Sequence, residues 1–435
     1  MVENRFISLE PKGRGSQYTF TYKLPANSIF YFLTSRFDEN QDNDSIRQDA
    51  TDCEIQLEVY ENNGIFLGMN DKPEQAYQSG GMYYNGALNK LGTHIASLSK
   101  RYYGQPLWFN LNSIKKAGYS TAFLSGEGWC DAGTMKNIRV MASRYSDGRK
   151  ETFHLSDTLY QITGYGRTLE ENDLSGYIFD TALQNTISPL TTQPQVFHIK
   201  GQSQYFNFIL SDSQHETSYA KNELAVTYKL FTTSNRTITE VTDHKQKLNK
   251  FEMVNTIRLD IGRLIDEYPN VGYVEAYLSW RLETEPSQEE QYRIVSHPLR
   301  FQILSECLHK VNDFAFLNRL GGWSSFNFAG TEKTDFKASA TTNYKTHTPD
   351  KLISSEIESV YNKSVTEQFS AETMPVTKEV CDWLKELSTS RAVYELSTKR
   401  YVIVDELNIK HDTKDELFRL EMKYHYSDAY NARIE

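Results

Sequence analysis

The stretch Phe418-Arg-Leu-Glu-Met-Lys-Tyr-His-Tyr426 decides the fold class, because apolar and polar residues alternate strictly along it. A period of two places one set of side chains on the core face of a strand and the other set in water, as in antiparallel sheets with one solvated side. The same alternation occurs at Tyr18–Leu24, Cys53–Val59, Ile138–Ala142, Leu224–Leu230 and Val274–Trp280. Strands spread over the whole chain in this way predict β-sandwich or barrel modules.

Length and composition support a β-rich protein with more than one module. The 435 residues exceed what one hydrophobic core usually supports. The 28 Tyr and 23 Phe favour pleated, half-buried surfaces. We therefore expect a mainly β fold of two to three antiparallel β-sandwich modules, Ig-like or jelly-roll-like, with few helices.

One segment near the C-terminus has helical periodicity. In Thr377–Leu387, the residues Val380, Trp383, Leu384 and Leu387 share one helix face, and Thr377 suits the N-cap. The segment predicts a C-terminal amphipathic helix over 377–387. Ser354–Tyr361 is a second, weaker helical candidate.

Polar stretches suggest where modules begin and end. Ser146–Lys150 is the first candidate boundary, and a second lies near 300–310, while Gly330–Asp350 is a further polar stretch. The resulting expectation is an N-terminal β domain with long loops or an arm over 1–148, a central β-sandwich over 149–305 and a C-terminal α+β domain over 306–435.

Two segments predict hairpins. Val196–Lys200 and Gln204–Leu210 read as strands joined at Gly201. Asn312–Gly330 contains two aromatic, strand-like halves around Gly321-Gly322, where glycine tolerates the positive φ of a tight turn. Asn318 is placed to satisfy backbone groups in that turn. This aromatic hairpin is interpreted as a contribution to the core.

Residues with catalytic or ligand-binding spacing are not recognisable in the sequence. The ten histidines include no pair at i, i+2 or i, i+4, and His198 and His425 fall in the polar phase of their strands, where a surface histidine is expected. The acidic run Asp38–Asp44 lacks the glycine and terminal Glu of a calcium loop. We therefore predict no catalytic residues, no cofactor-binding residues, no metal site and no enzymatic activity.

Charge and hydropathy limit the partners. The net charge of −10 argues against a general or sequence-specific nucleic-acid surface. Met1–Ser8 has no basic region followed by an apolar run, and no stretch approaches the ~18 apolar residues of a membrane span. The expectation is a protein made in a cytoplasm, without direct membrane contact.

Several segments resemble virion structural proteins of tailed phages and prophages of Bacteroidetes, including the crAss-like group. They are Phe316–Trp323, Cys381–Arg391, Tyr401–Val404, Ser188–Gln202 and Tyr205–Phe208, so the resemblance covers the C-terminal half. It implies a tail, neck ring, tail hub or baseplate component of the virion, made in the host bacterial cytoplasm and assembled in multiple copies. The implied partners are other virion structural proteins and further copies of the chain in a ring. No functional residues come with the resemblance.

Two other functions stay open at this stage. A carbohydrate- or receptor-binding β-sandwich would expose aromatic side chains on a concave face, and a hydrolase would assemble its site in space. For an assembly component, tyrosine suits the rim of an interface. Gln75–Leu107, with Tyr83, Tyr84, Tyr102 and Tyr103, is predicted to be an arm that contacts a neighbouring subunit.

Overall fold

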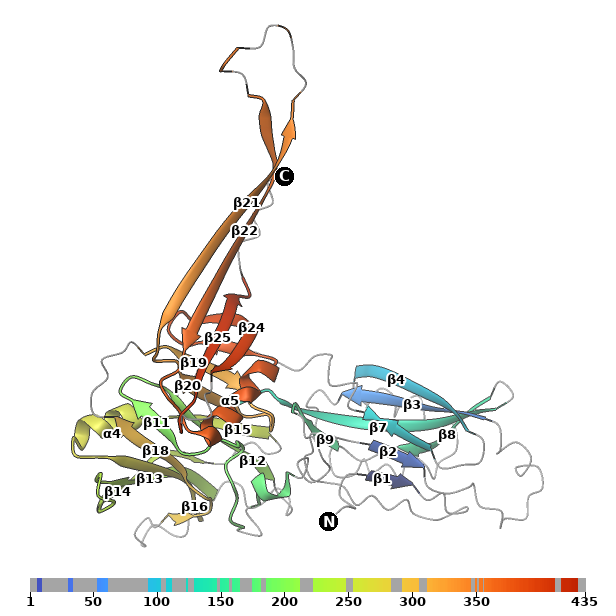
Figure 1. The fold of residues 1–435 in the computed structure, drawn as a ribbon. Coiled ribbons are helices and arrows are strands. Elements are labelled where there is room, and N and C mark those ends of the chain that lie inside the picture. The colour runs from blue at the N-terminus through green and yellow to red at the C-terminus, as the bar shows by residue number, and fades with distance from the viewer. Residues whose placement is uncertain are drawn as a thin grey trace.

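The chain is mainly β, with five sheets and two α-helices among the residues that the computed structural model describes. The described ranges are 6–9, 30–33, 53–61, 93–102, 107–111, 123, 129–146, 149–155, 159–164, 174–180, 185–211, 222–247, 253–282, 292–304, 311–345, 349, 352–354, 356–410 and 416–428. Most strand pairs are antiparallel, as the alternating patterns predict. Figure 1 shows an N-terminal group of strands beside a body from which one long hairpin projects.

Two sheets contain the N-terminal strands. The smaller has the order β1-β2-β5 and contains β1 (Phe6–Leu9), β2 (Phe30–Leu33) and β5 (Leu107–Asn110). The larger has the order β4-β3-β7-β8, with β9 beside β7. Its strands are β3 (Cys53–Glu61), β4 (Thr93–Tyr102), β7 (Met135–Ser146), β8 (Arg149–Leu155) and β9 (Leu159–Ile162). The predicted core positions Ile55, Leu57 and Val59 are fully buried, whereas the predicted strand over 18–24 lies outside the described residues.

Two further sheets form the middle of the chain. A four-stranded sheet, β10-β12-β15-β6, contains β6 (Trp129–Asp131), β10 (Ile178–Asp180), β12 (Gln204–Ser211) and β15 (Met253–Leu259). A six-stranded sheet has the order β11-β18-β16-β13-β14, with β17 beside β16. It contains β11 (Val196–Ile199), β13 (Asn222–Phe231), β14 (Thr237–Lys247), β16 (Tyr273–Leu282), β17 (Arg293–Ile294) and β18 (Leu299–Leu304). A short helix that the sequence did not predict, α4 (Ile261–Glu267), follows β15.

The predicted hairpin around Gly201 is wrong, although both of its strands exist. β11 pairs in parallel with β18, whereas β12 pairs with β15 and β10 in the other sheet. Gly201 has a positive φ of 91° in the turn that carries the chain from one sheet to the other. Most residues of both strands are buried. Each strand belongs to a different sheet and packs there, so the two do not pair with each other.

The C-terminal sheet has seven strands in the order β20-β19-β23-β24-β25-β22-β21. They are β19 (Asp313–Leu317), β20 (Trp323–Asn327), β21 (Glu332–Tyr344), β22 (Glu358–Glu372), β23 (Val393–Glu395), β24 (Arg400–Lys410) and β25 (Arg419–Tyr426). The stretch that decides the fold class forms β25, and its alternate residues Leu420, Met422, Tyr424 and Tyr426 are buried.

A helix, α5 (Lys378–Thr389), covers the segment in which the sequence predicts one. Its buried residues include Val380, Trp383, Leu384 and Leu387, and Thr377 stands at the N-cap without a capping hydrogen bond from its side chain. The weaker helical prediction at Ser354–Tyr361 is wrong, because residues 358–361 belong to β22.

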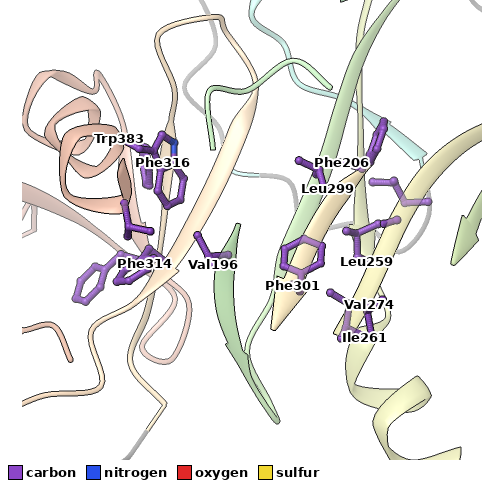
Figure 2. Close-up of a cluster of buried hydrophobic side chains, with 14 of the residues drawn as sticks. Val196, Phe206, Leu259, Ile261, Val274, Leu299, Phe301, Phe314, Phe316 and Trp383 are labelled. Carbon is purple, nitrogen blue, oxygen red and sulfur yellow. The ribbon is translucent and has the colours of Figure 1, made fainter. Parts of the chain in front are cut away.

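One hydrophobic core cluster joins the middle and C-terminal parts of the chain. Figure 2 shows Val196, Phe206 and Phe301 in the same cluster as Phe316 and Trp383. Residues on both sides of position 305, which was predicted as a domain boundary, therefore pack in the same core. The other predicted boundary, at 148, lies outside the described residues, between the paired strands β7 and β8 of one sheet.

Candidate interaction surface

The aromatic hairpin of the C-terminal sheet is a buried structural element and not a surface. β19 and β20 pair as predicted, and all residues of both strands are buried. The expected turn chemistry is confirmed: Gly321 has a φ of 94°, and the Asn318 Oδ1 accepts hydrogen bonds from the backbone N–H groups of Leu320 (3.0 Å) and Gly322 (3.1 Å).

Buried polar groups fix this hairpin to the middle of the chain. The Asn207 side chain donates to the Trp323 carbonyl (2.6 Å) and accepts from the Trp323 N–H (3.0 Å). On the helix side, the Glu386 carboxylate accepts from the Thr192 hydroxyl (2.5 Å) and from the Arg319 N–H (3.1 Å). Because these groups are largely removed from water, each lost partner would leave a buried polar atom unsatisfied. The network links the middle and C-terminal parts of the chain into one scaffold.

The exposed element on this scaffold is a β-hairpin, which we call the arm, formed by β21, β22 and the described residues between them (345, 349, 352–354, 356 and 357). Figure 1 shows the arm projecting far from the rest of the chain. β21 has 13 residues, which span about 40 Å at ~3.3 Å per residue, and every one of them is exposed. β22 joins the sheet only at its end, where Phe369–Glu372 pair with β25. In the described part of the chain, the rest of β22 pairs with β21 alone.

The register of the arm divides it into two faces. Phe369 pairs with Tyr424 and lies 5.6 Å from its ring, so this side of the arm continues the core face of the sheet. We call it the apolar face. It carries Thr334, Phe336, Ala338, Ala340, Thr342, Tyr344, Glu358, Val360, Lys363, Val365, Glu367 and Phe369. Because side chains alternate across a strand, the core pattern of the body extends outward along the arm.

The opposite side, which we call the polar face, continues the solvent face of the sheet. The Gln368 amide donates to the Asp405 carboxylate (3.3 Å) on that side, and the hydroxyls of Ser339 and Ser364 form a hydrogen bond of 2.6 Å across the two strands. Its members are Lys333, Asp335, Lys337, Ser339, Thr341, Asn343, Ser359, Asn362, Ser364, Thr366 and Gln368. The arm is thus amphipathic with the period of a strand.

Exposed apolar side chains gather on the arm. Seven of the ten exposed large hydrophobic side chains described for the chain lie between Phe336 and Tyr361. Phe336 is 62% exposed, Tyr344 77% and Ile353, near the tip, 108%. The remaining three are on or beside β24 and β25, in the same sheet. Such a concentration of exposed apolar side chains on one hairpin is typical of a site of contact with another molecule.

Local contacts hold the two strands together at the outer end of the arm. The Lys345 N–H donates to the Ile357 carbonyl (2.8 Å), and the Lys345 ammonium forms an ion pair with Glu356. A hydrogen bond to Glu358 raises the pKa of Tyr344 above its usual value. These contacts set the register of the hairpin. They add little stability, because exposed ion pairs contribute little, and they do not supply a core.

The arm predicted over Gln75–Leu107 is wrong where the structure describes it. Thr93–Tyr102 form β4, which pairs with β3 along its length and so belongs to the sheet of its own chain. Residues 75–92, with Tyr83 and Tyr84, lie outside the described residues, as does Tyr103. The sequence signal for the real arm was the alternation of Thr334, Phe336 and Ala338 in the polar stretch Gly330–Asp350; small residues on the apolar face weaken that signal.

The two histidines predicted on strand surfaces have different environments. His425 is half-exposed, and its Nδ1 lies 2.9 Å from the Asp405 carboxylate. For His198 the prediction is wrong: the side chain is fully buried beside Phe301, and burial lowers its pKa to about 3. A neutral imidazole results, and neither ring nitrogen has a hydrogen-bond partner among the described atoms.

Neither a search for metal-ligand clusters nor comparison with known proteins indicates a second functional site in the described part of the chain. Across the described ranges, no group of three or more His, Cys, Asp or Glu side chains is arranged to hold a metal ion. No helix in the described part is both long and apolar enough to cross a bilayer. A scan against protein-family models finds no match to this chain, and a search of curated proteins finds none either. Among the described residues, the arm is therefore the main candidate interaction surface.

Proposed function

We propose that this protein is a structural component of a tailed bacteriophage virion, in the tail, neck ring, tail hub or baseplate, where it assembles in multiple copies through protein–protein contacts. The observation that supports this proposal most is the arm. Its apolar face continues the core face of a sheet but has no covering layer among the described residues. Burial of such a face by a neighbouring protein is favourable by about 25 cal/mol per Å².

The form of the scaffold agrees with this role. The polar network around Asn207 and Glu386 links α5 and β20, the strand before the arm, to the middle of the chain, and a preorganised element presents an interface at little entropic cost. The proposed partners are other virion structural proteins and further copies of the chain. Binding to carbohydrate is less well supported, because the exposed aromatic side chains described (Phe336, Tyr344 and Tyr361) follow the extended arm.

Labelling of purified particles tests the proposal. An antibody against the full-length chain should label virions from the producing bacterium at the neck or tail in immunoelectron microscopy. The label should be lost from particles of a phage mutant that lacks the gene, and those particles should be incomplete at the same position. A chain that is found only in the soluble fraction of infected cells, with complete particles formed without it, would overturn the proposal.

A further inference from the structure

We propose that the arms of neighbouring copies pair edge to edge, with β21 of one copy beside β22 of the next, and close into a β-barrel in the assembled ring. This inference rests on the proposed function as a multi-copy component and specifies how copies contact one another. The occupant of the arm is thus a second copy of this chain.

The arm is incomplete when it stands alone. Beyond Phe369, two strands continue without a third strand in the described part of the chain. An isolated two-stranded hairpin is at best marginally stable in water, because it has no covered face and two open edges. β21 is long, and all of its 13 residues are exposed. The need for a further strand or a covering layer is therefore greater than in a short hairpin.

The two open edges of the arm are complementary to each other. β21 and β22 are antiparallel. When identical arms point the same way around a rotation axis, β21 of one copy lies antiparallel to β22 of its neighbour. Every edge then meets the opposite edge, as in a closed head-to-tail ring. About eight strands are needed before side chains fit inside a barrel, so about four copies are the minimum.

The outer half of each edge of the arm lacks the features that usually prevent pairing, whereas the inner half of β21 carries four charged residues. Long strands avoid edge contacts through proline or frequent charges. Ala338–Tyr344 contains no charged residue and no proline, and Glu358–Thr366 contains only Glu358 and Lys363 as charges. Because Lys363 would meet the uncharged outer half of β21, charge does not oppose the contact. Ser and Thr predominate there, and both residues tolerate a strand.

The arm also has two chemically different faces. A closed barrel separates an inner from an outer surface, and alternate side chains belong to each. Edge pairing would join the polar faces of all copies, including Lys333 and Ser339, into one continuous surface. It would likewise join the apolar faces around Phe336 and Val365, and it would leave no open edge.

Cross-linking between two single-cysteine variants of the full-length chain tests this pairing. Ser339→Cys places a thiol on β21 and Ser364→Cys places one on β22, and both side chains are exposed. A mixture of the two variants, assembled and treated with a short bismaleimide, should give covalent dimers at least tenfold above either variant alone. The parent chain measures background from its own cysteines. Equal yields from the mixture and from each variant alone would overturn the proposal.

A truncated arm separates this inference from the proposed function. Replacing residues 336–367 by Asn-Gly keeps the base pair Asp335–Gln368 and supplies a hairpin turn. The variant should keep the circular dichroism and melting temperature of the body but fail to form rings in light scattering and electron microscopy. Rings of unchanged symmetry from the truncated chain would overturn the arm barrel while leaving the virion role intact. Absence of the chain from particles would instead remove the virion role.

Discussion

At the scale of single residues, Asp313 is an unusual group in the scaffold. Its carboxylate is buried at the start of β19, where one oxygen accepts a hydrogen bond of 2.7 Å from the Ser203 N–H. The other oxygen has no partner among the described atoms. Burial raises the pKa of Asp313 from 3.8 to about 7, against the opposing effects of the Ser203 N–H and Arg258.

The raised pKa makes stability depend on pH in a defined direction. Between pH 4 and 7 the folded chain retains a proton that the unfolded chain releases, so the free energy of unfolding falls as pH rises through this window and levels off above it. Asp313→Asn removes this contribution while keeping the shape. Urea unfolding at pH 5 and pH 8 should show the variant gaining stability relative to the parent at pH 8, by a few kcal/mol at about 1.4 per pKa unit. A difference that stays constant with pH would contradict the assignment.

Position 322 requires glycine because neighbouring atoms leave no room for a Cβ, and not because its φ is positive. A Cβ at this position would lie 2.8 Å from the Leu190 carbonyl oxygen and 2.8 Å from the Asn207 side chain. Gly322→Ala should therefore reduce the free energy of unfolding by about 1–3 kcal/mol, the usual cost of overpacking. Gly262→Ala in α4 is the matched control, since a Cβ there meets nothing within 4 Å. The control should be neutral or more stable by roughly 0.5–1 kcal/mol; similar losses in chemical denaturation of both variants would refute the contact argument.

At the scale of elements, the two faces of the arm make opposite predictions. Phe336 lies on the apolar face and is 62% exposed, while Lys337 follows it on the polar face. If a neighbour buries the apolar face, Phe336→Ser should weaken self-association about 10- to 100-fold, as expected for ~1.5–3 kcal/mol of lost burial. Lys337→Ser should change it little. Sedimentation equilibrium of both variants measures this, and equal effects on association would argue against burial of the apolar face.

Elements with local signals were predicted well from the sequence, and elements that depend on long-range pairing were not. β25 was predictable because Leu420, Met422 and Tyr424 alternate with charged residues, which requires one buried face. The hairpin turn at Asn318 and Gly321 was predictable from turn chemistry alone. β11 and β12 were assigned to the wrong partners, because burial of most of their residues removes the alternation that would report a shared face.

The arm was missed for a different physical reason. Its apolar face uses Ala338, Ala340 and Thr342, whose small side chains give a weak hydrophobic period. If the arm is covered only after assembly, as we propose, it need not carry the strong pattern of a folded core. The predicted arm over Gln75–Leu107 followed clusters of tyrosine, but part of it forms β4, which pairs within its own sheet.

At the scale of the whole molecule, the shared core predicts how the chain unfolds. The cluster that contains Phe206 and Trp383 extends over both the middle and the C-terminal sheets, and Asn207 bonds directly to Trp323. Both parts should therefore melt in one transition. Asn207→Ala in the middle part and Trp383→Ala in the C-terminal part should lower the same calorimetric peak, the latter by about 3–5 kcal/mol.

The comparison of those two variants is decisive because separate domains would respond differently. If residues near 305 divide two independent units, then Asn207→Ala would move one peak and Trp383→Ala another. A common shift would place α5, β19 and the six-stranded sheet in one cooperative unit. The ring component that we propose would need this coupling, since contacts made by the arm would then fix the orientation of the scaffold that carries it.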